Sequence, residues 1–462
     1  MRNTLPASVV ILGLARQGVA LARFFAGRGA HVTVSDRRSA EALTAEKQSL
    51  RDLPIRYVLG EHPFELLDDC ELFCLSGGVP ADLPIVKEAI RRGIPLSNDA
   101  QEFLRRCPAP VVGITGSAGK TTTTTLTGQI LAADGFKTWV GGNIGNPLIN
   151  EAAQMAPEHR VVMELSSFQL EIMVGPGAVS PQVAGVLNIT PNHLDRHKTM
   201  EAYCAAKRNV VAHQSAKDVA VLGYDEPNAR ALSEATVAQV RYFSGYIEPS
   251  EGAFLRGESL VLRRDGREEI ICRREDLHLP GFHNVLNVLA AITLSNAAGA
   301  TVEAMQRAIT TFNGVEHRLE EVRRWGGALW INDSMATAPE RVLAALAAFD
   351  DPLILLAGGR DKDLMWEDFA QRVTERVRVL ITFGEAADLI EGHVARAREK
   401  AGEVAQLQEI VAAGTLENAV AEAAQRVQPG DVVLLSPGGT SFDAFRDFAE
   451  RGARFRDLVG QL

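Results

Sequence analysis

The sequence has few cysteines, few aromatic residues and no long hydrophobic run. Tryptophan occurs 4 times and tyrosine 5 times in 462 residues. The five cysteines are Cys70, Cys74, Cys107, Cys204 and Cys272. Because their number is odd and their spacing matches no zinc motif, we expect buried thiols in a reducing compartment, not a disulfide framework or a zinc site.

No apolar run approaches the length of roughly 18 residues that a membrane span requires. The first apolar run, Val9–Leu12, stops at Gly13 and is too short for the core of a signal peptide. It suits a first strand instead. We therefore expect a cytoplasmic protein without membrane attachment.

Positive charge is also in the minority, with 48 basic against 58 acidic residues and a net charge of −10. This balance favours solubility and argues against a general nucleic-acid binder, although a local basic cleft can still hold phosphates. At about 100–200 residues per domain, a chain of this length predicts about three domains.

Apolar runs alternate with amphipathic stretches over most of the chain, which predicts an α/β fold of parallel sheets covered by helices. The predicted strands are Ser8–Leu12, His31–Ser35, Leu72–Ser76, Val111–Thr115, Arg160–Leu165, Val183–Ile189, Leu329–Asn332, Pro352–Ala357, Val377–Phe383 and Asp431–Ser436. Gly, Ser, Asp or Asn follows many of them directly. Ligands of open α/β sheets bind in the loops at these carboxyl ends.

Two junctions divide the chain. Cys107-Pro-Ala-Pro110 stiffens it before one strand, and Phe312-Asn-Gly314 ends the predicted helix Val302–Thr311. We therefore predict three domains. They are an N-terminal Rossmann-like domain (1–108), a central domain with a parallel sheet of the P-loop ATPase kind (109–312) and a C-terminal Rossmann-like domain (313–462).

The segment Val237–Leu279 interrupts the alternation of strands and helices. It holds short β-like pieces, and Asp265-Gly266 between Leu260–Arg263 and Glu269–Arg273 is typical of a two-residue hairpin turn. We predict that this segment is a small β-rich insertion in the central domain.

A glycine-rich loop between a strand and a helix is the strongest functional signal. The strand Val111–Thr115 runs into Gly116-Ser-Ala-Gly119, and Lys120-Thr121-Thr122 opens the predicted helix, Thr123–Ala133. Glycines let backbone N–H groups surround phosphate oxygens, and the helix N-terminus adds unpaired N–H groups. Lys120 supplies charge for the β- and γ-phosphates, and the hydroxyl of Thr121 can bind Mg²⁺.

Polar residues also follow two other predicted strands. Glu164 ends a buried strand, where its carboxylate can hold the magnesium of a neighbouring nucleotide. The loop after Val183–Ile189 contains His193, Asp195 and Arg196, a cluster that suits metal or phosphate chemistry better than core packing. At two other positions the spacing alone does not establish a function. It favours a solvated helix lysine at Lys207, and Asn284 is either a helix cap or a contact to the nucleotide base.

Together these motifs resemble the Mur ligase family, which also includes the folylpolyglutamate synthases. The shared motifs, in chain order, are Thr115–Thr122, Asn143, Glu164–Gln169, Asn188–Thr190 with His193–Arg196, Lys207, His283-Asn284 with Asn287, His317-Arg318 and Asn332-Asp333-Ser334. Glu164–Glu171 and Leu435-Ser-Pro-Gly438 further resemble the branch that adds D-glutamate to UDP-N-acetylmuramoyl-L-alanine, and this likeness covers essentially the whole chain. The implied activity is that of an ATP-dependent, ADP-forming ligase of peptidoglycan synthesis, and hence of cell-wall growth and cell division.

The resemblance implies a site built from all three domains, with the third closing over the second. The implied ATP-binding residues are Gly116, Ser117, Ala118, Gly119, Lys120, Thr121, Thr122, Asn284, Arg318 and Asp333. The implied catalytic residues are Lys120, Glu164, His193 and Lys207. Two Mg²⁺ ions are implied, one held by Thr121 and Glu164, the other by His193 and a carbamylated Lys207.

The substrates implied by the resemblance are small molecules, and the protein is expected to act as a monomer. Asp36 and Arg38 would bind the uridine, and Asn143 would contact the muramoyl group. The residues implied around the glutamate are Thr337, Lys362, Ser441, Phe442 and Phe448.

The sequence departs from the family pattern at two positions. The first loop, Gly13-Leu-Ala-Arg-Gln-Gly18, has Ala15 where the family usually has a glycine. This departure affects the part of the site that is expected to bind the uridine. Met335 replaces a lysine that usually contacts the glutamate carboxylates, unless Arg341 or Arg360 takes over. The sequence therefore leaves open whether the amino acid is D- or L-glutamate.

Three other functions compete with this interpretation. One is a different ligase of the same family, including the extension of folate, which the complete N-terminal domain disfavours. Another is a nucleotide-dependent switch, which would need neither the His193 and Lys207 pair nor a glutamate pocket. The third, an NAD-dependent dehydrogenase, rests only on Gly13, Gly18 and Asp36.

Overall fold

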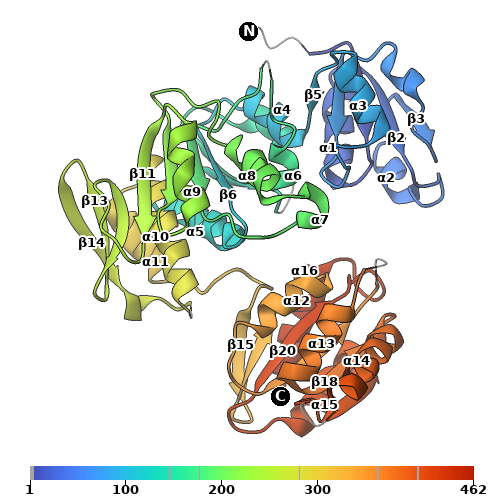
Figure 1. Cartoon of the computed structure of the whole chain (residues 1–462), viewed down its shortest axis with the longest axis vertical. Helices are drawn as coiled ribbons and strands as arrows, with labels where there is room; N and C mark the ends of the chain where they lie inside the picture. The colour runs from blue at the N-terminus through green and yellow to red at the C-terminus, as the bar shows by residue number, and fades with distance from the viewer. Residues whose placement is uncertain (1–4, 145–146, 176, 280, 362–363, 403–404) are drawn as a thin grey trace. The chain divides into compact units, whose positions relative to one another are not determined.

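Three sheets form the framework of the chain (Figure 1). The structure, a computed structural model, describes residues 5–144, 147–175, 177–279, 281–361, 364–402 and 405–462. By their contacts these residues form two compact units, Met1–Phe312 and Asn313–Leu462. The first unit holds two of the sheets and the second holds one.

The N-terminal sheet is entirely parallel, with the strand order β3-β2-β1-β4-β5. Its strands are β1 (Ser8–Leu12), β2 (His31–Asp36), β3 (Ile55–Leu59), β4 (Leu72–Leu75) and β5 (Leu96–Ser97). The helical segments beside them are α1 (Arg16–Ala26), α2 (Thr44–Ser49), η1 (Phe64–Leu67), α3 (Pro84–Arg91) and α4 (Asp99–Arg106). The central strand β1 is an unbroken apolar run buried from Val9 onward, as expected where both faces of a parallel sheet are covered. The predicted Rossmann-like domain is confirmed.

The central sheet has nine strands in the order β14-β13-β12-β11-β10-β9-β6-β8-β7. Its strands are β6 (Val111–Thr115), β7 (Thr138–Gly142), β8 (Arg160–Glu164), β9 (Val183–Val186), β10 (Val219–Gly223), β11 (Gln239–Ser244), β12 (Gly252–Arg256), β13 (Ser259–Arg264) and β14 (Arg267–Arg273). The helical segments are α5 (Lys120–Ala133), η2 (Leu148–Asn150), η3 (Ala152–Gln154), α6 (Ser167–Leu170), α7 (Leu194–His197), α8 (Met200–Arg208), α9 (Pro227–Arg230), η4 (Ala231–Ala235), η5 (Arg274–Asp276), α10 (Phe282–Ala297) and α11 (Val302–Ile309). The phosphate-loop strand β6 lies between β8 and β9, so three loops meet at the carboxyl ends of adjacent strands.

The segment predicted as a small β-rich insertion in the central domain is indeed β-rich, and its strands extend this sheet. Strand β11 pairs in parallel with β10, and β12, β13 and β14 continue outward from it. The predicted hairpin is confirmed, because Asp265-Gly266 joins β13 to β14 with φ angles of 51° and 72°. A two-residue hairpin loop of this kind requires positive φ at both positions.

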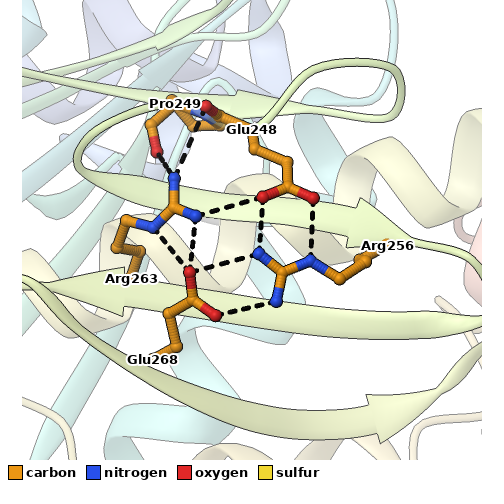
Figure 2. Close-up of polar contacts among 5 residues, drawn as sticks. All are labelled: Glu248, Pro249, Arg256, Arg263 and Glu268. Atoms are coloured by element: carbon orange, nitrogen blue, oxygen red, sulfur yellow. Dashed lines mark hydrogen bonds and ion pairs between the residues drawn. The ribbon is translucent and has the colours of Figure 1, made fainter.

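A surface network of two arginines and two glutamates joins these outer strands (Figure 2). Arg256 of β12 donates to Glu248 at 2.7 Å and to Glu268 of β14 at 2.8 Å. Arg263 of β13 donates to Glu268 at 2.9 Å and to the carbonyl oxygen of Pro249 at 2.7 Å. Exposed ion pairs contribute little to stability and weaken in salt, but this network fixes the loop before β12 to the hairpin.

The C-terminal sheet has the order β15-β16-β20-β17-β18-β19, with only β15 antiparallel. Its strands are β15 (Glu320–Trp325), β16 (Ala328–Asn332), β17 (Leu353–Gly358), β18 (Val377–Phe383), β19 (Glu409–Gly414) and β20 (Val432–Gly438). The helices are α12 (Pro339–Leu346), α13 (Glu367–Arg376), α14 (Ala387–Ala401), α15 (Leu416–Arg426) and α16 (Phe448–Gly460). Buried apolar clusters pack on both faces, which confirms the predicted α/β class for this domain as well.

Candidate active site

The phosphate loop turns sharply at Gly119, which precedes the first residue of α5. Gly119 has a φ of 81°, and a Cβ there would lie 2.1 Å from Oδ1 of Asn287. Glycine adopts this left-handed conformation without steric cost and leaves room for the asparagine. The helix begins at Lys120, the first of the three residues predicted to open it, because the turn at Gly119 directs the backbone into the helix.

A second loop holds the phosphate loop in place. The carbonyl oxygen of Asn188 accepts a hydrogen bond from the backbone N–H of Ser117 at 3.0 Å, and its side-chain oxygen accepts one from the N–H of Ala118 at 2.9 Å. The hydroxyl of Ser117 donates to the carbonyl of Thr190 at 2.9 Å and lies 3.0 Å from the hydroxyl of Tyr203. These bonds explain why β9 ends at Val186 and not at the predicted Ile189.

Two lysines converge on this loop. Lys120 donates to the carbonyl oxygen of Gly116 at 2.8 Å, and Lys207 donates to the same oxygen at 2.9 Å and to the hydroxyl of Thr115 at 3.2 Å. Lys207 is only 1% exposed. Its burial, together with the charge of Lys120, holds the pKa of the Lys207 ammonium well below its usual value, although Glu164 partly offsets the shift. The solvated helix lysine that spacing alone suggested is therefore wrong.

The predicted magnesium residues Thr121 and Glu164 are in direct contact. The hydroxyl of Thr121 donates to one carboxylate oxygen of Glu164 at 2.9 Å, and the side-chain amide of Asn143 donates to the other at 2.7 Å. Glu164 is 2% exposed. Strands β6, β7 and β8 thus bring a hydroxyl, an amide and a carboxylate together at one edge of the sheet.

His193 contacts an aromatic residue of the segment that follows Glu164. Its backbone has a φ of 53°, and its imidazole ring lies 5.0 Å from the ring of Phe168. His197 and the guanidinium of Arg196 also contact the Phe168 ring, at 5.6 and 4.3 Å. The side chain of Asp195 lies outside the described part of the chain. Over the residues that are described, no group of three or more His, Cys, Asp or Glu side chains forms a ready metal cage.

Asn284 and Asn287 lie on the first turns of α10. The Asn287 amide donates to the side-chain oxygen of Asn284 at 3.1 Å, and Asn287 also approaches Gly119. Asn284 is therefore linked to the phosphate loop through its neighbour. The candidate site of the first unit therefore includes the phosphate loop and the beginning of α10.

In the second unit, the chain bends tightly around Arg318. Both neighbours, His317 and Leu319, have positive φ angles, of 63° and 45°. The N–H of Leu319 donates to Asp333 at 3.3 Å, and the amide of Asn332 lies 3.0 Å from Nδ1 of His317. A bulky residue adopts such a backbone only where surrounding contacts impose it, so Asn332 and Asp333 help to hold the backbone on both sides of Arg318.

Asp333 is a buried carboxylate. Burial raises its pKa to about 7, although a hydrogen bond from the hydroxyl of Ser436, at 2.8 Å, opposes the rise. A second buried charge lies close by. The guanidinium of Arg451 donates to the hydroxyl and carbonyl oxygens of Ser334 at 3.0 and 2.9 Å. These bonds tie α16 to the loop that follows β16.

The described residues predicted to surround glutamate follow two strands of the second unit. Thr337 follows β16, and Ser441 and Phe442 follow β20, with Ser441 buried and Phe442 60% exposed. Phe448 begins α16 and accepts a hydrogen bond from Ser334 through its carbonyl oxygen at 2.7 Å. Lys362 lies outside the described residues.

The two arginines considered as substitutes for the usual lysine at Met335 differ in their contacts. Arg341 of α12 donates to the carbonyl oxygen of Met335 at 3.2 Å. Arg360 is held in a two-bond ion pair with Glu385, at 2.7 and 2.8 Å. Of the two, Arg341 is the one in contact with position 335.

In the N-terminal domain, Asp36 and Arg38 bind each other. Arg38 donates to Asp36 from its backbone at 2.9 Å and from its guanidinium at 3.0 Å, and Asp36 also accepts from the N–H of Leu14 at 2.7 Å. Burial alone raises the pKa of Asp36, but these hydrogen bonds outweigh it, and the pKa lies below its usual value. The pair therefore organises the first loop, next to Ala15.

Sequence reasoning did not assign several residues that shape this site. Asn188 and Tyr203 hold the phosphate loop, and Phe168 packs on His193. A signal existed for Tyr203, which precedes Lys207 by four residues and therefore lies one helical turn away. For Phe168, the ring contacts depend on a loop conformation that no periodicity encodes.

Three family models match successive parts of the chain. They are a Mur ligase MurD-like N-terminal domain over residues 7–98, a Mur ligase middle domain over 114–295 and a Mur ligase glutamate ligase domain over 317–439. Together they cover most of the chain in the expected order. The chain belongs to the Mur ligase family.

Curated relatives match over nearly the whole length. The chain is 43% identical over 454 residues to the UDP-N-acetylmuramoylalanine–D-glutamate ligase of Symbiobacterium thermophilum, covering 98% of this chain and 97% of that protein. It is 41% identical over 455 residues to the enzyme of the same name from Geotalea uraniireducens, with the same coverage. The similarity thus extends through all three domains.

Solved structures support the fold. UDP-N-acetylmuramate-alanine ligase MurC of Thermotoga maritima matches with a TM-score of 0.56 and 19% identity, over 98% of this chain and 99% of that chain. E. coli FolC matches with a TM-score of 0.53 and 15% identity, over 79% and 92%. Within the described residues, no helix is long and apolar enough to cross a membrane.

Proposed function

We propose that this chain joins D-glutamate to UDP-N-acetylmuramoyl-L-alanine at the expense of ATP, releasing ADP and phosphate, in the synthesis of peptidoglycan precursors. The observation that carries the proposal is the group formed at Gly116 by Lys120 and Lys207, next to the Thr121–Glu164 contact of 2.9 Å. Near-full-length similarity to ligases of that name supports the choice of substrates.

The residues present fit ATP and Mg²⁺. Gly116–Thr122 form an anion-binding loop at the N-terminus of a 14-residue helix. Thr121 and Glu164 offer the oxygen ligands that Mg²⁺ prefers. When bound, Mg²⁺ would neutralise phosphate charge and make the γ-phosphorus more electrophilic.

We propose a nucleotide site completed by Asn284, Arg318 and Asp333. Asn284 is linked through Asn287 to the phosphate loop, and the backbone on both sides of Arg318 is constrained. Arg318 and Asp333 belong to the second unit, Asn313–Leu462.

We further propose that Lys207 is carbamylated and, with His193, holds a second Mg²⁺. Only a neutral amine reacts with CO₂, and a lowered pKa makes the neutral form of Lys207 more abundant at neutral pH. The carbamate would replace a cation by an anionic oxygen ligand. Its charge would then attract Lys120 instead of repelling it.

The chemistry follows from the charges at the loop. Lys120 would draw the γ-phosphate towards the substrate carboxylate, which attacks phosphorus and displaces ADP, so that an acyl-phosphate forms. The neutral amine of glutamate then attacks the acyl carbon, phosphate leaves and an amide remains. Cationic and polar donors at the loop would stabilise the tetrahedral oxyanion between these steps.

We propose that Asn143 contacts the muramoyl group and that Asp36 and Arg38 bind the uridine. The glutamate would lie among Thr337, Lys362, Ser441, Phe442 and Phe448. Arg341, which contacts the backbone of Met335, is our candidate for the missing cation. We assign D-glutamate because the named relatives use it.

The remaining proposals concern organisation. We propose the domain boundaries 1–108, 109–312 and 313–462. The chain would act as a monomer in the cytoplasm, where ATP and nucleotide sugars are made. Its ligands would be small molecules, without nucleic acid or membrane.

The test is an ADP-release assay with UDP-N-acetylmuramoyl-L-alanine and single amino acids. We expect ADP release to require the nucleotide sugar and D-glutamate together, with an equal amount of amide product. Release with L-glutamate instead would overturn the assignment of chirality. ADP release that needs no amine would favour a nucleotide-dependent switch and overturn the ligase assignment.

A further inference from the structure

A buried glutamine organises the loop that carries Glu164. Gln169 is fully buried, and its side-chain oxygen accepts from the N–H of Ser166 at 3.0 Å. The N–H of Gln169 in turn donates to the hydroxyl of Ser166 at 3.2 Å, which closes a reciprocal cap on α6. The backbone between Glu164 and α6 is therefore fixed from the Gln169 side.

The other end of the Gln169 side chain reaches the junction between the N-terminal and central domains. Its amide nitrogen lies 3.3 and 3.4 Å from the two carboxylate oxygens of Asp99. Asn98 donates its side-chain amide to the carbonyl oxygen of Gln169 at 2.7 Å. Two consecutive residues, 70 positions away in the sequence, thus hold both the side chain and the backbone of Gln169.

Asp99 is an unusual residue to find at such a place. It is 1% exposed, and burial raises its pKa to about 6, although the bond from Gln169 and nearby N–H groups oppose the rise. A buried carboxylate destabilises a fold unless its hydrogen bonds compensate. None of the steps proposed for the reaction uses Asp99, so its burial calls for another explanation.

A second contact from the N-terminal domain reaches the same loop. Arg16, the first residue of α1, donates to the carbonyl oxygen of Asn143 at 3.1 Å, and Asn143 donates to Glu164. The charge of Arg16 also favours the ionised form of Asp99. The surroundings of Glu164 are therefore supported from the N-terminal domain both through Asn143 and through Gln169.

We propose that Asp99 is a positioning residue that holds Gln169, and through it the Glu164–Gln169 segment, in the geometry that binds magnesium–nucleotide. This inference rests on the proposed function of Glu164. It predicts that a substitution at Asp99 weakens the binding of Mg²⁺ and ATP, although Asp99 is not proposed to contact either of them. Outer partners of metal ligands typically change metal affinity about 10–100-fold when removed.

The first test is Asp99→Ala in the full-length protein, with initial rates measured over a range of Mg²⁺ and ATP concentrations. We expect the half-saturating Mg²⁺ concentration and the KM for ATP to rise about 10-fold, while the KM for glutamate stays within about 2-fold. The matched control is Glu102→Gln, a fully buried carboxylate of the same helix that binds Ser97, Arg105 and Arg106. This control is expected to lower the melting temperature without changing the Mg²⁺ requirement.

The second test exchanges donor and acceptor between the two positions. Gln169→Glu places two carboxylates against each other and should raise the Mg²⁺ requirement at least as much as Asp99→Ala. Adding Asp99→Asn lets the new amide donate to the new carboxylate, and the double variant should recover to within about 3-fold of the original. The inference would be overturned if Asp99→Ala and Gln169→Glu had the same Mg²⁺ requirement as the unmodified chain. It would also be overturned if Glu102→Gln raised that requirement as much as Asp99→Ala does.

Failure of this inference is distinguishable from failure of the proposed function. If the unmodified chain forms no amide, the function is wrong, whatever the variants do. Mg²⁺-dependent binding of ADP, measured by calorimetry, supplies a readout that needs no turnover. If ADP binds with the same affinity and Mg²⁺ dependence to Asp99→Ala and to the unmodified chain, Asp99 does not position the site.

Discussion

The ammonium groups of Lys120 and Lys207 donate to one and the same oxygen, the carbonyl of Gly116, at 2.8 and 2.9 Å. Two like charges at one acceptor repel each other. Of the two lysines, only Lys207 is buried, with 1% of its surface exposed. Burial first, and the charge of Lys120 second, lower the pKa of Lys207. Lys120, which we propose binds phosphate, and Lys207, which we propose is carbamylated, are therefore electrostatically coupled.

Replacing Lys120 with alanine should abolish the phosphorylation of the substrate. Lys120 is a cation of the loop and donates to the carbonyl oxygens of Gly116 and Ser117. Preorganised charges of this kind are worth about 100-fold or more in kcat, so we expect at least that loss with an unchanged melting temperature. Lys137→Ala, at an exposed lysine beyond the same helix, is the control and should retain full kcat.

Replacing Lys207 with methionine should remove activity and raise stability. High bicarbonate should not restore turnover, whereas short-chain carboxylic acids added to Lys207→Ala should restore part of it. An unaltered rate in either variant would exclude a catalytic role for Lys207.

The stability of the Lys207→Met variant should depend on pH in a defined direction. Because the pKa in the folded state lies below the usual 10.5, the unfolded chain binds more protons between the two values. The original protein therefore gains stability as pH rises towards 10.5. In bicarbonate-free buffer, the melting-temperature advantage of the variant should be larger at low pH than at high pH, and the opposite trend would contradict the shift.

Asp333 should give the opposite pH dependence. Its pKa rises from 3.8 to about 7 on folding, so the folded chain holds more protons between these values and loses stability as pH rises through them. Asp333→Asn lacks this loss. Its melting temperature relative to the original should therefore increase from pH 4 to about pH 7 and then stay level. A constant difference across that range would show that Asp333 ionises normally.

Replacing Glu164 with glutamine should raise the Mg²⁺ requirement strongly. The single amide oxygen of the variant can accept from Thr121 or from Asn143 but not from both, and the negative charge is lost. We expect the half-saturating Mg²⁺ concentration to rise about 10-fold or more. Glu268→Gln, in the surface network of Figure 2, is a control far from this chemistry and should leave the requirement unchanged.

The core of the fold could be predicted because its strands are continuous apolar runs. Strands β1, β6 and β18 have the predicted bounds. Other strands lack that signal. β7 ends in two glycines, and the half-buried edge strand β15 reads Glu-Glu-Val-Arg-Arg-Trp without alternation. Edge pairing, not local sequence, determines such strands.

The candidate site could be predicted only where a local sequence motif determines the backbone geometry. The order strand, Gly116–Gly119, Lys120 and helix predicts a phosphate loop, whereas the position of Glu164 at a strand end is only a weak signal, and its predicted role comes from the family resemblance. The burial of Lys207 beside Thr115 was not predictable, because it depends on how α8 packs on the sheet. Contacts between distant segments, such as Asp99 with Gln169, leave no periodic trace in the sequence.

The most direct test of the central claim follows the oxygen atoms of the substrate carboxylate. UDP-N-acetylmuramoyl-L-alanine labelled with ¹⁸O in that carboxylate is incubated with ATP, Mg²⁺ and D-glutamate, and the released phosphate is analysed by mass spectrometry. If the carboxylate is phosphorylated at the Lys120 loop, each phosphate carries one ¹⁸O atom. Amide formation with unlabelled phosphate would contradict the account.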